Sequence, residues 1–316
     1  MFQVASRPIP ELTLPMNPHV AAVPPSLQLP RTLQRPNFSE VSRDIIASLE
    51  PELADVPIEY IRRHLAGQAN SMLSALSLMT YPTSLPRARL ASSIDVSVRP
   101  TSNAPNTSAF PTHMLAISSS RSSPSQPNTP TAASFTAGAS STLTVPLFPS
   151  HAVVLAAYCT LLPALPRSRP SNRTATMSLP VVPLTVPSAE TFQMLHAYLH
   201  TKRPDTLLAA LLPSLAASLP QAPSGGTSSS AGRSVYVSQF TSESLSRLAH
   251  ALASAAAQIG PQGALSSLMA HAKVINGLWR NVCALGVFDA ELWGVMDLAW
   301  EVVLIALTRI AERERH

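Results

Sequence analysis

Proline constrains this chain more than any other residue type. Of the 316 residues, 31 are proline, and proline lacks a backbone N–H and fixes its own φ angle, so it interrupts helices and central strands. Much of it lies in tracts that are also rich in Ser and Thr, which bury too little apolar surface to fold. We therefore expect an ordered part of roughly 200 residues, divided by tracts that do not fold.

These tracts define the expected organisation of the chain. Residues 1–37 are expected to be extended or disordered, and disordered insertions are expected near 101–141, 166–177 and 221–233. Between them the sequence predicts an amphipathic helical segment over 38–80, a core over 90–290 and a C-terminal helix over 289–313. Within the first insertion, only His113–Ile117 is apolar enough to pair with another segment.

Charge and apolar runs limit the surfaces that the chain can offer. The formal net charge is +5, from 22 Lys and Arg against 17 Asp and Glu, and the basic residues are scattered, which does not favour direct contact with nucleic acid. The densest basic group, Pro166–Arg173, is interpreted as a solvated loop, with a nuclear signal or a phosphate contact as the alternative. The uncharged run Val145–Pro166 has only about 13 helix-compatible residues between its prolines, against the roughly 20 that a bilayer needs. We expect no membrane span, and no signal or transit peptide at the N-terminus.

Short strands and helices alternate in the middle of the chain. Ile94, Val96 and Val98 alternate with polar residues, which predicts a half-buried strand. Thr142–Phe148 is interpreted as a short strand before a buried helix at His151–Leu162, and Ser178–Val186 as a strand that its prolines place at a sheet edge. Together with the helical segments, this predicts a helix-rich α+β fold with a small sheet flanked by helices.

Helical patterns dominate the second half. Pro187–Thr201 and Leu207–Leu219 are predicted helices, and from Thr241 onward the chain is nearly all helix, with breaks at Gly260-Pro261, Gly277 and Gly286. Asp289 is the expected N-cap of the last helix.

All three tryptophans, Trp279, Trp293 and Trp300, lie near the C-terminus. The last helix carries a continuous apolar seam with three- and four-residue spacing, formed by Trp293, Met296, Trp300, Val303, Leu307 and Ile310. Two interpretations stay open: packing within the chain, which the short length of the seam favours, and a seam that faces a partner protein. The three tryptophans are the first candidates for partner-binding residues.

Residues with catalytic potential do not assemble into a known motif. His196 and His200 lie four residues apart on one helix, but neither the Glu of a metalloprotease motif nor a third ligand accompanies them, so no metal site is predicted. Cys159 and Cys283 lie in apolar patterns, which predicts ordinary packing in a reducing compartment rather than a nucleophile. No phosphate-binding or dinucleotide-binding loop occurs, so we expect no cofactor and a protein that is not an enzyme.

Four segments in order resemble the BTB/POZ domain. IDVSV (94–98) is similar to its first strand, FPSHAVVLAAYC (148–159) to its signature strand and helix, and LTVPSAETFQMLHAYLHT (184–201) to the strand and helix that end in a Tyr-Thr motif. The spacing from Leu268 to Cys283 is similar to the later helices of that domain. The chain departs from the family in its long insertions and in Lys202, which stands where a Gly usually follows the Tyr-Thr motif.

RPDTLLAALLP (203–213) and VINGLWRNVCALGVFDAELWGVMDLAWEVV (274–303) resemble the clampless proteins of basidiomycete fungi, and GLWRNVCALG is the most distinctive part. The resemblance implies a regulator of clamp-cell formation and dikaryotic growth. It would act in the nucleus and cytoplasm, through protein contacts with the mating-type transcriptional programme.

Two other functions stay open. The BTB resemblance implies a self-associating scaffold or ubiquitin-ligase adaptor, which would use the face around Asp95 and could form a homo-oligomer. The basic charge balance suggests a direct DNA binder, the least favoured of the three.

Overall fold

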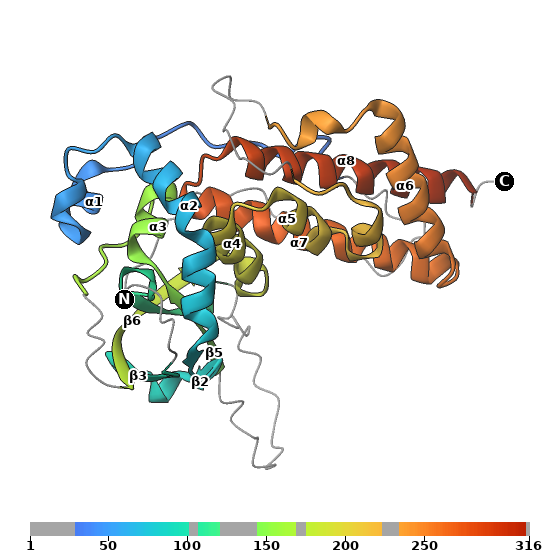
Figure 1. Cartoon of the computed structure of the whole chain (residues 1–316). Coiled ribbons are helices and arrows are strands. Elements are labelled where there is room, and N and C mark those ends of the chain that lie inside the picture. Colours follow the sequence, from blue (N-terminus) through green and yellow to red (C-terminus); the bar gives the residue numbers. More distant parts are fainter. Residues whose placement is uncertain (1–28, 101–106, 121–143, 169–174, 223–233, 314–316) are drawn as a thin grey trace, which may run out of the picture.

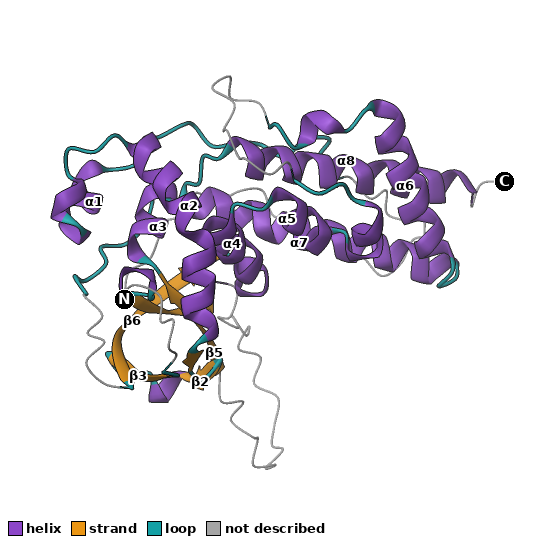
Figure 2. Cartoon of the chain, in the orientation of Figure 1, coloured by secondary structure: helices purple, strands orange, loops and turns teal. Residues whose placement is uncertain are grey.

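The computed structural model describes residues 29–100, 107–120, 144–168, 175–222 and 234–313. The expected disorder of residues 1–28, of most of 101–141, of 169–174 and of 223–233 lies outside the described residues. Within them the fold is helix-rich α+β, as predicted: a curled sheet at one end is joined to a long helical body (Figures 1 and 2).

Six strands form one mixed sheet in the order β1-β3-β6-β4-β5-β2. Only β4 and β6 pair in parallel, and the other neighbours are antiparallel. The strands are β1 (Met79–Thr80), β2 (Ser84–Pro86), β3 (Ser93–Val98), β4 (His113–Ser119), β5 (Thr144–Ser150) and β6 (Thr176–Val186). The edge strands β1 and β2 are consecutive in the chain and separated only by residues 81–83, so the sheet must curl until its two edges come close together (Figure 2).

The alternation of side chains along the strands supplies two separate cores. On β4, Met114 and Ala116 point into a small cluster inside the curl, whereas Leu115 and Ile117 point into a large cluster shared with the helices. The cluster inside the curl also holds Phe110 and, from β3, Val96 and Val98. The strand predicted over Ile94–Val98 is therefore confirmed, and its alternate residues are buried as the pattern indicated.

The edge position predicted for the Ser178–Val186 strand is wrong, because β6 lies inside the sheet. The strand changes partner near its middle: residues 176–180 pair with β3 and residues 181–186 with β4. Across this ladder the Val98 amide of β3 donates to the Ala175 carbonyl beside β6, and the Val181 amide of β6 donates to the Ser92 carbonyl beside β3, each at 2.8 Å. In that alternation Pro180 falls at a position whose nitrogen points away from β3, so a proline is tolerated without an edge.

Eight α-helices are described. They are α1 (Arg43–Leu49), α2 (Ile58–Ser77), α3 (Ala152–Tyr158), α4 (Ala189–Thr201), α5 (Pro204–Leu211), α6 (Ser242–Ala257), α7 (Pro261–Leu285) and α8 (Ala290–Arg313). The helix predicted over Leu207–Leu219 is instead split, because Pro213 begins a separate 3-10 turn after α5. Helices α5 to α8 form the long body, and α4 lies between this body and the sheet (Figure 1).

Glycine marks one helix end and one close contact. Gly286 adopts a left-handed conformation with φ 63° and ends α7, as predicted, and the side chain of Asp289 caps α8 by accepting a hydrogen bond from the Leu292 amide at 3.0 Å. The break predicted at Gly277 is wrong, because α7 continues through it. A Cβ at Gly277 would lie 2.9 Å from the Ser188 Oγ, so the glycine serves the close approach of α7 to the start of α4.

Candidate partner-binding surface

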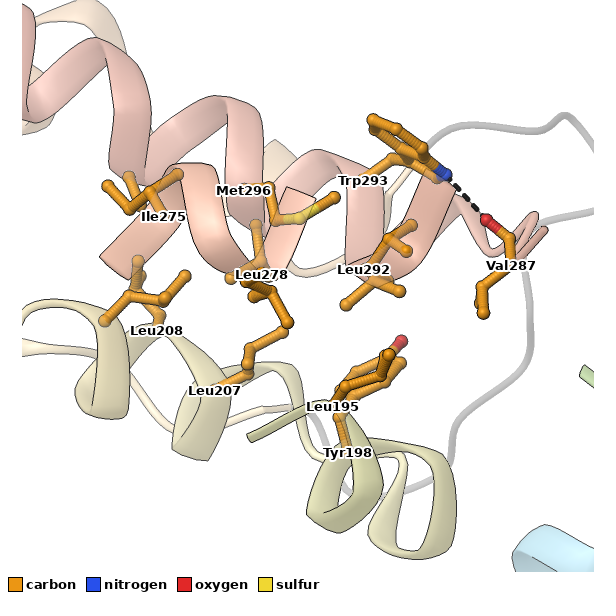
Figure 3. Packing of buried hydrophobic residues seen from close by; sticks show 14 of the residues in the cluster. Leu195, Tyr198, Leu207, Leu208, Ile275, Leu278, Val287, Leu292, Trp293 and Met296 are labelled. Atoms are coloured by element: carbon orange, nitrogen blue, oxygen red, sulfur yellow. Dashed lines mark hydrogen bonds between the residues drawn. The ribbon is translucent and has the colours of Figure 1, made fainter. Parts of the chain in front are cut away.

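The candidate tryptophans lie on two adjacent helices. Trp293 and Trp300, on α8, are each 3% exposed, and Trp279, on α7, is half-buried. Trp293 donates its indole N–H to the Val287 carbonyl at 3.0 Å, in the turn before α8 (Figure 3). Figure 3 also shows Met296 and Leu292 of α8 facing α7 and α4. The apolar seam of the last helix thus packs within the chain.

Two of the tryptophans also bind an extended segment from the other end of the sequence. Trp300 donates its indole N–H to the Pro30 carbonyl at 2.9 Å, and Trp279 donates to the Gln34 carbonyl at 2.7 Å. Residues 29–38, which we call the N-terminal strap, form neither helix nor strand. Because the indoles bind backbone carbonyls, these two contacts do not depend on the side chains of the strap.

Side chains of the strap add further contacts. Leu33 is 6% exposed and belongs to the large core cluster. Arg35 pairs with Asp297 of α8 at 2.5 Å, and its guanidinium lies 5.4 Å from the centre of the Trp293 ring. Phe38 meets Phe288 edge to face at 5.2 Å between ring centroids.

Most of these contacts are open to water. The side chains of Arg35 and Asp297 are 53% and 41% exposed, and Phe38 is 73% exposed. Exposed ion pairs contribute only about 0–1 kcal/mol. Leu33 is therefore the one deeply buried side chain of the strap, and the segment is held at a few points rather than packed along its length.

Asp95 lies apart from the tryptophans. Its side chain is exposed on β3, opposite Ser178 of β6, and the curled sheet that carries it lies at the other end of the molecule from the body of α7 and α8 (Figure 1). The structure therefore groups the three tryptophans with the strap and leaves Asp95 on a separate face.

A largely buried ion pair joins the two halves of the molecule. Lys202, just after α4, lies 2.5 Å from Asp289 before α8, and Tyr198 donates its hydroxyl to the same carboxylate at 2.7 Å. The Lys202 ammonium also lies 3.6 Å from the centre of the Tyr158 ring. Burial lowers the pKa of Lys202, and although burial alone would raise the pKa of Asp289, the adjacent Lys202 holds it below its usual value.

Lys202 has the left-handed backbone of a glycine. Its φ is 51°, and it is the one described non-glycine residue with a positive φ. This position ends α4, where a glycine would avoid a strain of roughly 1–2 kcal/mol. In return, the lysine side chain pairs with Asp289 and lies against the rings of Tyr158 and Tyr198, contacts that a glycine could not make.

A histidine cluster lies where the sheet meets the helices. His151, His196 and His200 are buried, with ring centroids 4.3 Å apart for the last two and 5.3 Å apart for His151 and His200. His151 bonds the Ala109 carbonyl through Nε2 at 2.8 Å, so that nitrogen carries the proton. Burial and the neighbouring His200 lower the pKa of His151 to about 4, and burial holds the pKa values of His196 and His200 below the usual value as well.

One pair in this cluster has the spacing of a nucleophile and a base. The Ser150 hydroxyl lies 2.7 Å from His196 Nε2. Ser150 is fully buried, and its hydroxyl donates to the Phe148 carbonyl. A general base works best with a pKa near the working pH, whereas burial lowers the pKa of His196 well below that range. The pair fits a structural role at the junction of β5 and α3.

The other sequence candidates fall into packing roles. Cys159 is buried and Cys283 half-buried, and burial raises the pKa of the Cys159 thiol to about 12 and that of Cys283 to about 11, so neither favours the thiolate. No group of three or more His, Cys, Asp or Glu suited to a metal occurs among the described residues. In the described part of the basic loop, Arg167 donates to the Ser48 carbonyl of α1. None of the described helices is both long and apolar enough for a bilayer span.

The docking of the strap is not visible in the sequence pattern. The many prolines of residues 1–37 predict extended or disordered chain, although Leu29, Leu33 and Arg35 lie among them. An extended stretch with a buried leucine between two prolines is a signal of docking, but it is visible only beside its partner. That partner is the surface of α7 and α8, more than two hundred residues away.

These observations define a class: a two-part α+β protein whose curled sheet and helical body share one core, with an aromatic surface that binds extended chain. Comparison with known families agrees with the two parts. The N-terminal domain of clampless protein 1 matches residues 36–187, and the C-terminal domain of the same protein matches residues 205–316. Together they span most of the chain, which therefore belongs to the clampless protein 1 family.

The two matched regions follow the architecture. The first contains α1 to α3 and the whole sheet, the second contains α5 to α8, and α4 lies between them. Membership in this family indicates a role in clamp formation and fungal sexual development. No curated protein and no solved structure matches the chain.

Proposed function

We propose that this protein is a non-enzymatic regulator of clamp-cell formation and dikaryotic growth. It acts in the nucleus and cytoplasm by binding proteins of the mating-type-dependent transcriptional machinery. Family membership supports the developmental role, and one observation carries the mechanism: the indoles of α7 and α8 bind the backbone of an extended segment, which is the chemistry of a peptide-binding surface.

Trp279 is the residue to test, because it is the least buried of the three tryptophans. In a strain that lacks the gene, full-length protein with Trp279→Ala should recover fewer partner proteins by affinity purification from mating cells, and should restore fewer clamp cells. Tyr60→Ala is the matched control, since this aromatic side chain is 63% exposed on α2. Thermal unfolding of both variants checks that the fold is kept. Wild-type partner recovery and clamp formation with Trp279→Ala would refute the proposed mechanism.

The curled sheet supports a second role. We propose that it belongs to a divergent BTB/POZ-like domain formed by residues 90–290. The left-handed Lys202 at the position of the usual Gly, and His151 between a strand and a helix, support this relation. In that case the exposed face around Asp95 is the place for self-association. Light scattering on the full chain should show a dimer that Asp95→Lys dissociates, and a monomer at tens of micromolar would exclude it.

A further inference from the structure

The N-terminal strap behaves as a ligand of the helical body rather than as part of its core. Its main anchor is the buried side chain of Leu33, and Leu29 is partly buried against the same core cluster. Its other contacts are two indole-to-carbonyl hydrogen bonds and exposed charged or aromatic contacts. Segments with few buried apolar contacts open at low free-energy cost while the rest of the fold stays intact. The surface beneath the strap can therefore be uncovered without unfolding α7 and α8.

That surface is built to recognise a particular chemistry. The indole donors of Trp279 and Trp300 bind main-chain carbonyls, so they accept any extended backbone. Asp297 and the face of the Trp293 ring together select a cation, and a guanidinium satisfies both. The large core cluster accepts one aliphatic side chain, and the Phe288 ring adds an edge-to-face contact.

The geometry points to a docking site on α7 and α8 for an extended segment of a partner protein, which the strap occupies within the same chain. The partner segment carries a leucine, an arginine two residues later and an aromatic residue three residues after that, as do Leu33, Arg35 and Phe38. Since strap and partner compete for one surface, the strap lowers the affinity of the protein until a stronger or more concentrated segment displaces it. This inference names the partner chemistry of the function proposed above and rests on it.

A labelled peptide with the sequence of residues 29–40 tests the site on the full-length chain. A tethered strap has an effective concentration in the millimolar range, so the wild-type chain should bind the peptide weakly. Leu33→Asp in the chain removes the buried anchor of its own strap. Because burial of a leucine changes an equilibrium by roughly ten- to a hundredfold, fluorescence anisotropy should show the peptide bound at least about tenfold more tightly.

Arg31→Glu is the matched control, because Arg31 is an exposed arginine of the same strap without a contact to Asp297. It should leave the affinity for the peptide within about twofold of wild type. Charge exchange then tests the mode of binding. Asp297→Lys, added to Leu33→Asp, should reverse the preference of the chain, so that a peptide carrying Arg35→Glu binds better than the wild-type peptide.

Equal peptide affinity for the wild-type and Leu33→Asp chains would overturn the inference, as would an unreversed preference with Asp297→Lys. If Leu33→Asp unfolds the chain, as near-ultraviolet circular dichroism would show, Arg35→Glu in the chain replaces it, with an expected gain of about threefold. The peptide assay needs no cellular partner. The peptide assay could therefore fail while Trp279→Ala still reduces partner recovery in mating cells. That combination would overturn the inference about the strap and leave the proposed function standing.

Discussion

At the residue scale, Lys202 shows how one side chain can combine conflicting demands. It accepts left-handed backbone strain, places a cation in a largely buried site, and pairs with an aspartate that also caps α8. Removing one member of a buried ion pair is more costly than the pair is worth, because the other charge is left without a partner.

Lys202→Gly therefore makes a specific prediction. The substitution relieves the strain, but it leaves the largely buried Asp289 carboxylate without a cation, so urea denaturation should show a loss of about 3 kcal/mol in the free energy of unfolding. Adding Asp289→Asn should recover part of that loss, since asparagine keeps the cap without the charge. The control is Lys273→Met, because Lys273 is an exposed lysine inside a helix, where glycine would itself be destabilising. This substitution should change the free energy of unfolding by less than about 0.5 kcal/mol. A Lys202→Gly protein as stable as wild type would mean that the ion pair contributes nothing.

The buried histidines predict a dependence of stability on pH. Their pKa values are lowered in the folded chain, so between about pH 6.5 and the folded pKa of about 4 for His151 the unfolded chain binds more protons. The free energy of unfolding should be unaffected by them above pH 6.5 and should fall as the pH falls through this window, by about 1.4 kcal/mol per unit of pKa shift.

Urea denaturation at several pH values measures this slope. His200→Gln removes one titrating group from the cluster and should flatten the slope between pH 6.5 and 4. His64→Gln, at an exposed histidine of α2, should leave the slope unchanged. A slope that does not respond to His200→Gln would assign the acid sensitivity to other groups.

At the element scale, two glycines within helices should respond to alanine in opposite ways. Alanine favours a helix over glycine by up to about 1 kcal/mol. At Gly67 of α2 a Cβ would meet nothing within 4 Å, so Gly67→Ala should raise the melting temperature. At Gly277 of α7 the Cβ would lie 2.9 Å from Ser188 Oγ and 3.0 Å from Thr191 Cγ2, so Gly277→Ala should lower it. Calorimetry distinguishes the two, and stabilisation by both would show that α4 moves freely away from α7.

The elements also show what could be predicted from sequence. The strand at β3, the helix α2 within the predicted helical segment 38–80 and the cap at Asp289 depend on local periodicity and on one side chain, and these predictions are confirmed. The central position of β6 depends on a change of partner within one strand, which no local pattern encodes. The break expected at Gly277 is wrong for the same reason. This glycine is needed for the close approach of residues at the start of another helix, and a local pattern does not show that contact.

The candidate site divides in the same way. The tryptophans could be selected from composition and spacing, but their acceptors could not. Pro30 and Gln34 lie 270 and 245 positions away from the indoles that bind them, and a carbonyl acceptor leaves no mark in the side-chain pattern.

At the scale of the whole molecule, one large hydrophobic cluster crosses the boundary between the two family domains. It includes Leu155 of α3, Leu195 of α4 and Val303 of α8. The two parts should therefore unfold in one cooperative transition rather than separately.

Probes on the two domains can test this. All three tryptophans lie in the second domain, so their fluorescence reports on that domain and on the strap that binds it. Cys159 lies in the first, and its buried thiol should react only on unfolding, so thiol labelling of a Cys283→Ser chain reports on that part. The two urea curves should coincide, and midpoints separated by more than about 0.5 M would indicate domains that unfold independently.

The order of strands in the sheet also has a consequence for synthesis on the ribosome. β6 supplies the middle of the sheet, yet it is the last of the six strands to be translated. Until residues 176–186 leave the exit tunnel, β3 and β4 lack the strand that lies between them, and their apolar side chains stay exposed in the nascent chain. The sheet of this protein is thus completed only after more than half of the polypeptide has been made, and in that interval molecular chaperones have the most exposed surface to bind.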